Sequence, residues 1–148
     1  RDQGLTKLSE AQSYVKETGI DCLAVAVGTS HGVYKGTPHL EFELLSTLSK
    51  EIAIPLVLHG GSGTGDENLA KAVKTGIQKV NLNTDLSEAG KNALRKALAD
   101  SAPKKDTKAT GEFAPKKMNM QQTIVAGAEG FQKVLEHYMQ LFDSQNRW

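Results

Sequence analysis

The chain has 148 residues, of which 39% are apolar and 24% charged, and its formal net charge is +1. This composition is typical of one globular domain, and it lacks the positive charge that would favour nucleic acid or an acidic membrane as a partner. The single cysteine, Cys22, excludes an internal disulfide, and no apolar run approaches the roughly 18 residues of a membrane span, so we expect a cytoplasmic protein without membrane or nucleic-acid partners.

The first elements in chain order are a helix, a strand and a second helix. Ser9–Gln12 has the form of a capping box that starts a helix, and Gly19 is a natural end for it. Residues 21–27 contain an unbroken apolar run, typical of a strand buried on both faces, which favours a parallel sheet. The next helix is predicted from the spacing of Leu40, Leu44, Leu45 and Leu48.

Two more units of strand, loop and helix follow. The strand over residues 54–58 leads into a glycine-rich loop, and Thr64–Glu67 has the form of a second capping box, whose helix should end at Gly76. A third strand is predicted over residues 78–83. The helix after it has an apolar side made of Leu86, Ala89, Ala93, Leu94 and Leu98.

The last third of the chain changes in character. Residues 100–117 are polar and lysine-rich, which indicates a solvated loop. From Asn119 onward an amphipathic helix is predicted. Its apolar side would form core or oligomer contacts through Ile124, Val125, Ala128, Phe131, Val134, Leu135, Tyr138 and Phe142.

Three residues whose side chains could take part in binding or catalysis lie where predicted strands end. His31, His59 and Asn81 are separated by about one strand–helix unit each, and the carboxyl ends of neighbouring parallel strands lie together. Two imidazoles there can share a zinc ion, although a catalytic zinc usually has three protein ligands and no third one stands out. Taken alone, His59 is more often a core histidine, and the glycines after it are more often just a turn.

The same loops offer an anion site. Gly60, Gly61 and Gly63 leave backbone amides unshielded before a predicted helix N-terminus, which is a typical phosphate site. The groups that would complete a phosphate cradle are Lys35, Ser62 and Thr84. Asn81 can donate a hydrogen bond to a polarised carbonyl or enediolate oxygen without adding charge.

Three stretches resemble the C-terminal signatures of the class II ketose-bisphosphate aldolases, the zinc-dependent fructose- and tagatose-bisphosphate aldolases. They are Gly28-Thr-Ser-His-Gly-Val-Tyr-Lys-Gly36, Leu58-His-Gly-Gly-Ser-Gly63 and Lys79-Val-Asn-Leu-Asn-Thr-Asp-Leu86. The resemblance runs in order from about Leu8 to Leu98, and more loosely to the C-terminus. It implies an α/β fold, a TIM (β/α)₈ barrel of which this chain holds the last three βα units and the terminal helices.

The resemblance also implies roles for individual residues. His31 and His59 would be zinc ligands, and Asn81 would act on the dihydroxyacetone portion of the substrate. A monovalent cation, Na⁺ or K⁺, would lie near the phosphate, held by backbone carbonyls around residues 30–32 and 60–62. The substrate and its phosphate would be bound by Gly32, Lys35, Gly60, Gly61, Ser62, Asn81, Leu82, Asn83 and Thr84.

Some parts of the family pattern are missing from this chain. The third zinc-binding histidine and the aspartate before it, the acid/base, belong to the first half of the barrel, and no Asp-His pair occurs here. A TIM barrel takes ~250 residues, and the chain begins with Arg1. We therefore expect residues 1–148 to be the C-terminal half of one barrel domain, with the N-terminal half supplied by another chain or a preceding segment.

The expected reaction is reversible aldol cleavage of a ketose 1,6-bisphosphate to dihydroxyacetone phosphate and glyceraldehyde 3-phosphate, in a homo-oligomer that is a dimer or tetramer. Residues 34–36 slightly favour the fructose 1,6-bisphosphate type, and residues 23–27 slightly favour the type that acts on its tagatose epimer. Of the two substrates, fructose 1,6-bisphosphate is favoured. Two other interpretations stay open: a non-catalytic phosphate-binding fragment, and a metal-free phosphate-binding barrel such as an isomerase. The isomerase leaves two histidines at neighbouring strand ends unexplained.

Overall fold

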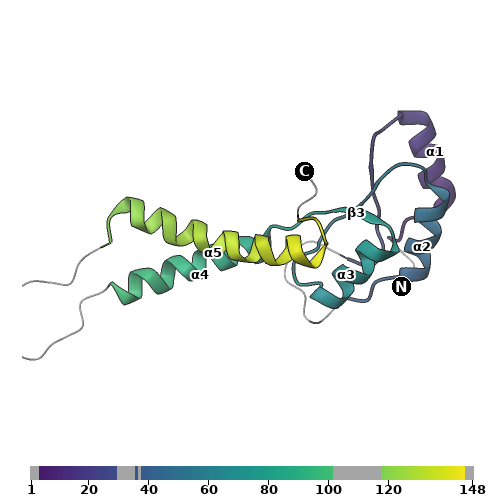
Figure 1. The fold of residues 1–148 in the computed structure, drawn as a ribbon. Coiled ribbons are helices and arrows are strands. Elements are labelled where there is room, and N and C mark those ends of the chain that lie inside the picture. Colours follow the sequence, from purple (N-terminus) through teal and green to yellow (C-terminus); the bar gives the residue numbers. More distant parts are fainter. Residues whose placement is uncertain (1–3, 30–35, 37, 102–117, 146–148) are drawn as a thin grey trace, which may run out of the picture. The chain divides into compact units, whose positions relative to one another are not determined.

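The computed structural model describes residues 4–29, 36, 38–101 and 118–145. The chain divides into two compact units, one made of residues 1–84 with 140–148 and the other of residues 85–139. Three helices and three strands alternate in the first unit (Figure 1). They are α1 (Leu8–Thr18), β1 (Leu23–Ala24), α2 (Phe42–Glu51), β2 (Leu56–Leu58), α3 (Asp66–Thr75) and β3 (Ile77–Val80).

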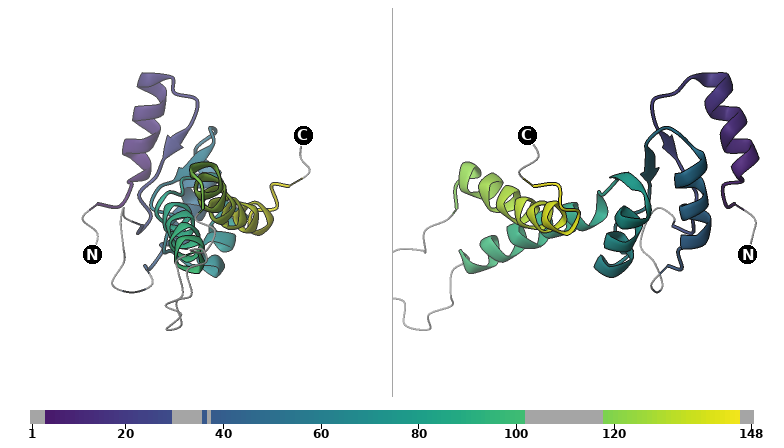
Figure 2. Two further views of the ribbon diagram at one scale, coloured as in Figure 1. Left: turned by 90° about the vertical axis from the view of Figure 1, so that its left-hand side faces the viewer. Right: turned by 45° about the vertical axis from the view of Figure 1, so that its right-hand side comes forward.

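The three strands form one parallel sheet in the order β1-β2-β3, which confirms the predicted sheet type. Leu23 pairs with Leu56, and Val57 pairs with Lys79, with an irregularity in register between Leu56 and Val57. The strands β1 and β2 run side by side in Figure 2. α2 packs against both α1 and α3, and α3 packs against β3.

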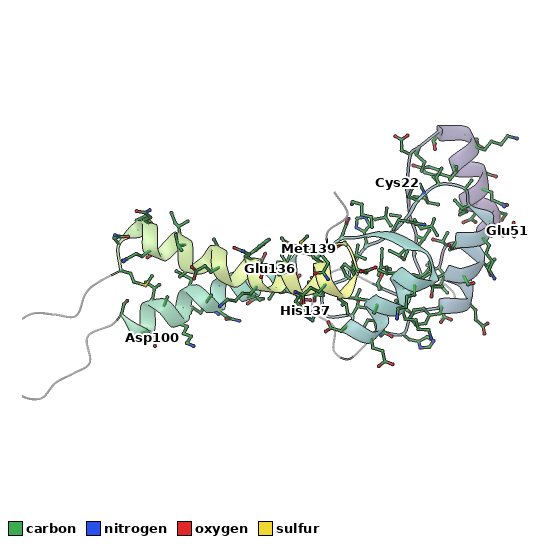
Figure 3. All side chains as sticks on the ribbon, viewed as in Figure 1. Cys22, Glu51, Asp100, Glu136, His137 and Met139 are labelled. Carbon is green, nitrogen blue, oxygen red and sulfur yellow. The ribbon has the colours of Figure 1, made fainter. Side chains whose placement is uncertain are left out.

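Burial differs between the central strand and its neighbours. Every residue of β2 is buried, whereas in β1 Leu23 is half-buried and Ala24 is exposed. Cys22, just before β1, is also exposed (Figure 3). The expectation that the whole apolar run of residues 21–27 is buried on both faces is therefore wrong. Val25 and Val27 are buried whereas Cys22 and Ala24 are exposed, so one face of this stretch is covered and the other is not in this chain.

The glycines predicted to end helices do so, but the two predicted capping boxes are wrong. Gly19 follows α1 with a φ of 63°, and its N–H donates to the Val15 carbonyl at 3.0 Å. Gly76 similarly ends α3. Ser9 lies inside α1, however, and α3 begins only after Gly65, with no side-chain cap at the start of either helix. The Thr64 hydroxyl donates to the Gly60 carbonyl at 3.0 Å.

The second unit is built from most of α4 (Thr84–Asp100) and α5 (Met120–Leu141), which lie side by side in Figure 1. Their backbones approach closely: a Cβ atom at Gly130 would lie 2.8 Å from the Ala89 carbonyl oxygen. The Tyr138 hydroxyl donates to the Asp85 carboxylate at 2.6 Å.

The predicted apolar side of α5 is only partly a core. Tyr138 is buried, whereas five of its other members are exposed in this chain: Ile124, Val125, Ala128, Phe131 and Leu135. The helix begins where predicted, because the Asn119 side chain accepts from the Gln122 amide at 2.8 Å and the Gln122 side chain accepts from the Asn119 amide at 3.0 Å. None of the helices in the described residues combines the length and apolar character needed to cross a membrane.

Candidate active site

The loops after β2 and β3 are joined directly at the carboxyl ends of these strands. The Asn81 amide donates to the Leu58 carbonyl at 2.9 Å, and the Gly61 amide donates to the Asn81 carbonyl at 3.3 Å. The two loops together enclose a cavity of about 440 Å³. Its lining contains every predicted site residue of these two loops: His59, Gly60, Gly61, Ser62, Asn81, Leu82, Asn83 and Thr84.

The glycine-rich loop has a backbone conformation that residues with larger side chains rarely adopt. Gly60 and Gly63 have φ values of 68° and 76°, in the left-handed region that favours glycine. A Cβ atom at Gly61 would lie 2.8 Å from a Val80 methyl group and 3.1 Å from the Asn81 carbonyl oxygen. The absence of a side chain at Gly61 therefore lets the two loops approach each other closely enough to share one cavity.

Ser62 connects the glycine-rich loop to the loop after β3. Its side chain is buried, and its hydroxyl oxygen accepts a hydrogen bond from the Asn83 amide at 3.3 Å. α4 begins at the next residue, Thr84, so the cavity lining includes the first residue of a helix. A buried hydroxyl, a glycine-rich backbone and a helix N-terminus are the features of a protein site for phosphate.

His59 and Asn81 lie against each other inside the cavity. The Asn81 Nδ2 atom is 3.1 Å from Nε2 of the imidazole and 3.4 Å from Nδ1. The lone pairs of the two ring nitrogens point in different directions, so an atom almost equally close to both lies over the ring and not on the lone-pair axis of either. The Asn81 amide therefore approaches His59 without occupying the direction from which a metal would be bound.

Two residues that the sequence did not single out support this arrangement. The Thr29 hydroxyl, just after β1, donates to the His59 carbonyl at 2.7 Å. The Lys79 ammonium donates to Oδ1 of Asn81 at 2.6 Å. The signals that could have found them are the position of Thr29 at a neighbouring strand end and the spacing of Lys79 and Asn81, since residues i and i+2 share one face of a strand.

Of the first of the three predicted loops, the structure describes Gly28, Thr29 and Gly36. His31, Gly32 and Lys35 lie outside the described residues, as do residues 102–117 of the predicted polar loop. Within the residues that are described, no three His, Cys, Asp or Glu side chains gather closely enough to hold a metal ion. His59 fits a zinc ligand in chemistry and position, but alone it is insufficient.

The family model for fructose-bisphosphate aldolase class-II matches residues 1–147. The chain belongs to the class II aldolase family. This confirms the resemblance inferred from the three stretches, and it includes the residues beyond Leu98, where that resemblance was looser.

Several known aldolases are similar to this class II aldolase chain. A sulfofructosephosphate aldolase of Alkalicoccus urumqiensis is 30% identical over 99% of the chain and 47% of its own length. A probable fructose-bisphosphate aldolase of Bacillus subtilis is 43% identical over 61% of the chain and 32% of its own length. The crystal structure of the YdjI aldolase from Escherichia coli K12 has a TM-score of 0.75 and 27% identity, covering 96% of the chain and 46% of that structure. The chain thus spans less than half the length of these relatives.

Proposed function

We propose that this chain is the C-terminal half of a (β/α)₈ class II aldolase that reversibly cleaves a ketose 1,6-bisphosphate, with fructose 1,6-bisphosphate favoured. The observation that carries the proposal is the cavity at the carboxyl ends of β2 and β3, where His59, Asn81 and the glycine-rich loop meet. TIM-barrel enzymes place their active sites at this end of the strands. The remaining strands would come from another chain or segment, in a cytoplasmic homo-oligomer.

His59 and His31 are the residues of this chain that would hold zinc. When bound, zinc supplies a Lewis acid for the ketone oxygen of the substrate. The third histidine and the acid/base aspartate would come from the missing half. Placing His59 on the loop directly after the fully buried strand β2 suits this role, because a metal ligand needs a rigid support.

The phosphate would be held by the glycine-rich loop, Ser62 and the start of α4, with Gly32 and Lys35 contributing from the first loop. A monovalent cation, Na⁺ or K⁺, near the phosphate would be bound by backbone carbonyls of the same loops. The described part of this site is supported by the Ser62–Asn83 hydrogen bond and by the cavity that Asn83 and Thr84 line. Asn81 would donate a hydrogen bond to the oxygen that gains negative charge during cleavage.

Two alternatives concern the substrate and the activity. A tagatose bisphosphate would use the same phosphate site, and the relative named sulfofructosephosphate aldolase adds a sulfonated ketose phosphate as a candidate. The alternative in activity is a non-catalytic phosphate-binding fragment, which would keep the anion site without turnover. All three possibilities are separated by assays on the complete protein.

The first prediction is that the 148 residues alone neither fold as a monomer nor cleave substrate. In this chain the sheet has two edge strands, and unpaired edges favour aggregation. Joining the chain to the N-terminal half should give a monodisperse protein that cleaves fructose 1,6-bisphosphate. Size-exclusion chromatography and a coupled assay for triose phosphates measure both properties, with the tagatose and sulfofructose substrates assayed in parallel.

A chelator should remove the activity of the complete protein, and added zinc should restore it. Cleavage that persists after complete removal of metal would contradict the zinc-dependent mechanism. Phosphate binding without cleavage of any of these substrates would favour the non-catalytic interpretation. A well-folded, active 148-residue chain would overturn the half-barrel assignment.

The second prediction is that Ser62→Ala in the complete enzyme raises KM for the bisphosphate. A hydrogen bond to a charged group contributes roughly 1.5–3 kcal/mol, so we expect KM to rise about tenfold to hundredfold. Lys35→Ala should raise KM more, because it removes a charge. Ser13→Ala, an exposed serine of α1, is the matched control. Wild-type KM in both the Ser62 and Lys35 variants would show that the phosphate lies elsewhere.

A further inference from the structure

We infer that Lys79 is a positioning residue that orients and polarises the Asn81 amide, an inference that rests on the proposed role of Asn81 in aldol cleavage. Lys79 lies on β3 and Asn81 is two residues further along the same strand direction, so their side chains share one face. The Lys79 ammonium is 2.6 Å from Oδ1 of Asn81. Among the described residues of the site, no other side chain donates a hydrogen bond to this oxygen.

The chemistry of the two groups decides which way the amide faces. An ammonium has three donors and no acceptor, whereas the asparagine side chain has one acceptor oxygen and one donor nitrogen. The oxygen must therefore face Lys79, because the reversed amide would set one donor against another. The nitrogen then faces His59 and the cavity, as its distances to the imidazole show.

The contacts of the Lys79 ammonium are with an amide. Lys79 is exposed in this chain and pairs in register with apolar Val57. The ion pairs recorded among the described residues join other side chains: Lys7 with Glu10, His39 with Glu41, and Lys91 with Glu88. Lys79 thus directs its charge at a neutral amide and not at a carboxylate.

A charge on the amide oxygen changes what the amide nitrogen can do. Hydrogen bonds in a chain polarise one another, so a cation at Oδ1 makes the Nδ2 protons stronger donors. A stronger donor is of most value when the acceptor is an oxygen that gains negative charge, which occurs in the transition state. Lys79 should therefore support kcat more than substrate binding.

The test uses the complete enzyme with Lys79→Met, which keeps the length of the side chain and removes its charge and donors. We expect kcat to fall about twofold to tenfold, less than in Asn81→Ala, because polarisation adds only a fraction of the energy of the Nδ2 hydrogen bond; KM and zinc content should stay close to those of the wild type. Lys79→Arg keeps a charged donor and should recover much of the loss. Lys74→Met, at an exposed position of α3, is the matched control and should have wild-type kinetics. Wild-type kcat in Lys79→Met would overturn the inference.

A double-mutant comparison separates positioning from a general structural role. If Lys79 acts through Asn81, then Lys79→Met should cause no further loss of kcat in an Asn81→Ala background. The same fold-loss in both backgrounds would show that Lys79 acts by another route and would overturn the inference.

A measurement independent of activity keeps the inference separate from the proposed function. The side-chain amide NMR signals of Asn81, identified by their loss in Asn81→Ala, should shift in Lys79→Met and not in Lys74→Met. An inactive wild-type protein in which this shift occurs would refute the proposed activity and leave the Lys79–Asn81 contact intact. Unshifted Asn81 signals in Lys79→Met would overturn the inference whether or not the protein is active.

Discussion

Replacing His59 by alanine in the complete enzyme is expected to abolish aldol cleavage and to lower the zinc content. The imidazole stands at the carboxyl end of the central strand and lines the cavity, and its nitrogens are the zinc-binding groups that this part of the site offers. If zinc is held as proposed, this variant removes one of its ligands, and the Lewis acid that the proposed cleavage requires would be lost with it. Metal analysis of the purified protein and a triose-phosphate assay measure the two effects.

His39→Ala provides the matched control for the metal prediction. His39 has an imidazole that is 82% exposed and lies 3.6 Å from the Glu41 carboxylate, so it should be replaceable without loss of zinc or activity. His31→Ala should behave like His59→Ala. Full zinc occupancy in either the His31 or the His59 variant would show that the ligand assignment is wrong.

The second large effect is expected for Asn81→Ala, which should lower kcat by about 10²–10³ while the zinc content stays unchanged. The amide nitrogen is an uncharged donor in the cavity, and removing one donor to a developing oxyanion typically has an effect of this size. The measurements are kcat, KM and bound metal for the variant and for Asn92→Ala, an exposed position of α4 that should be neutral. Loss of metal from Asn81→Ala would mean that Asn81 supports the His59 ligand instead of the reaction.

The sequence predicted the order of the elements and the place of the described site residues because both depend on local signals. Gly19 and Gly76 end helices because glycine adopts the required backbone conformation at little cost. His59 and Asn81 could be placed together because parallel strands bring their carboxyl ends to one edge. The details that could be predicted are therefore those set by neighbouring residues along the chain or by the parallel arrangement of the sheet.

The details that could not be predicted depend on contacts between distant residues. The Thr64 hydroxyl donates to the Gly60 carbonyl, a contact that forms only once the glycine-rich loop turns back. The exposure of Ala24 reflects a sheet face that the described residues do not cover at this point, and an apolar run does not show whether both faces of its strand are covered. The role of Thr29 likewise requires knowing that its hydroxyl reaches the His59 carbonyl on another strand.

The outer strands of the sheet, β1 and β3, each run parallel to β2, and this limits the assemblies that copies of the chain can form through their sheet edges. Copies that add through the outer sides of β1 and β3 would make a head-to-tail contact, which gives rings only when the rotation closes. On the outer side of β1 such a contact has to meet Thr6, which is already hydrogen-bonded to Ala26. Two copies of a three-stranded sheet contribute six strands, and three copies contribute nine. Copies of this sheet alone therefore cannot supply the eight strands at which a (β/α)₈ barrel closes. Closure at eight strands requires a complement of five strands from elsewhere.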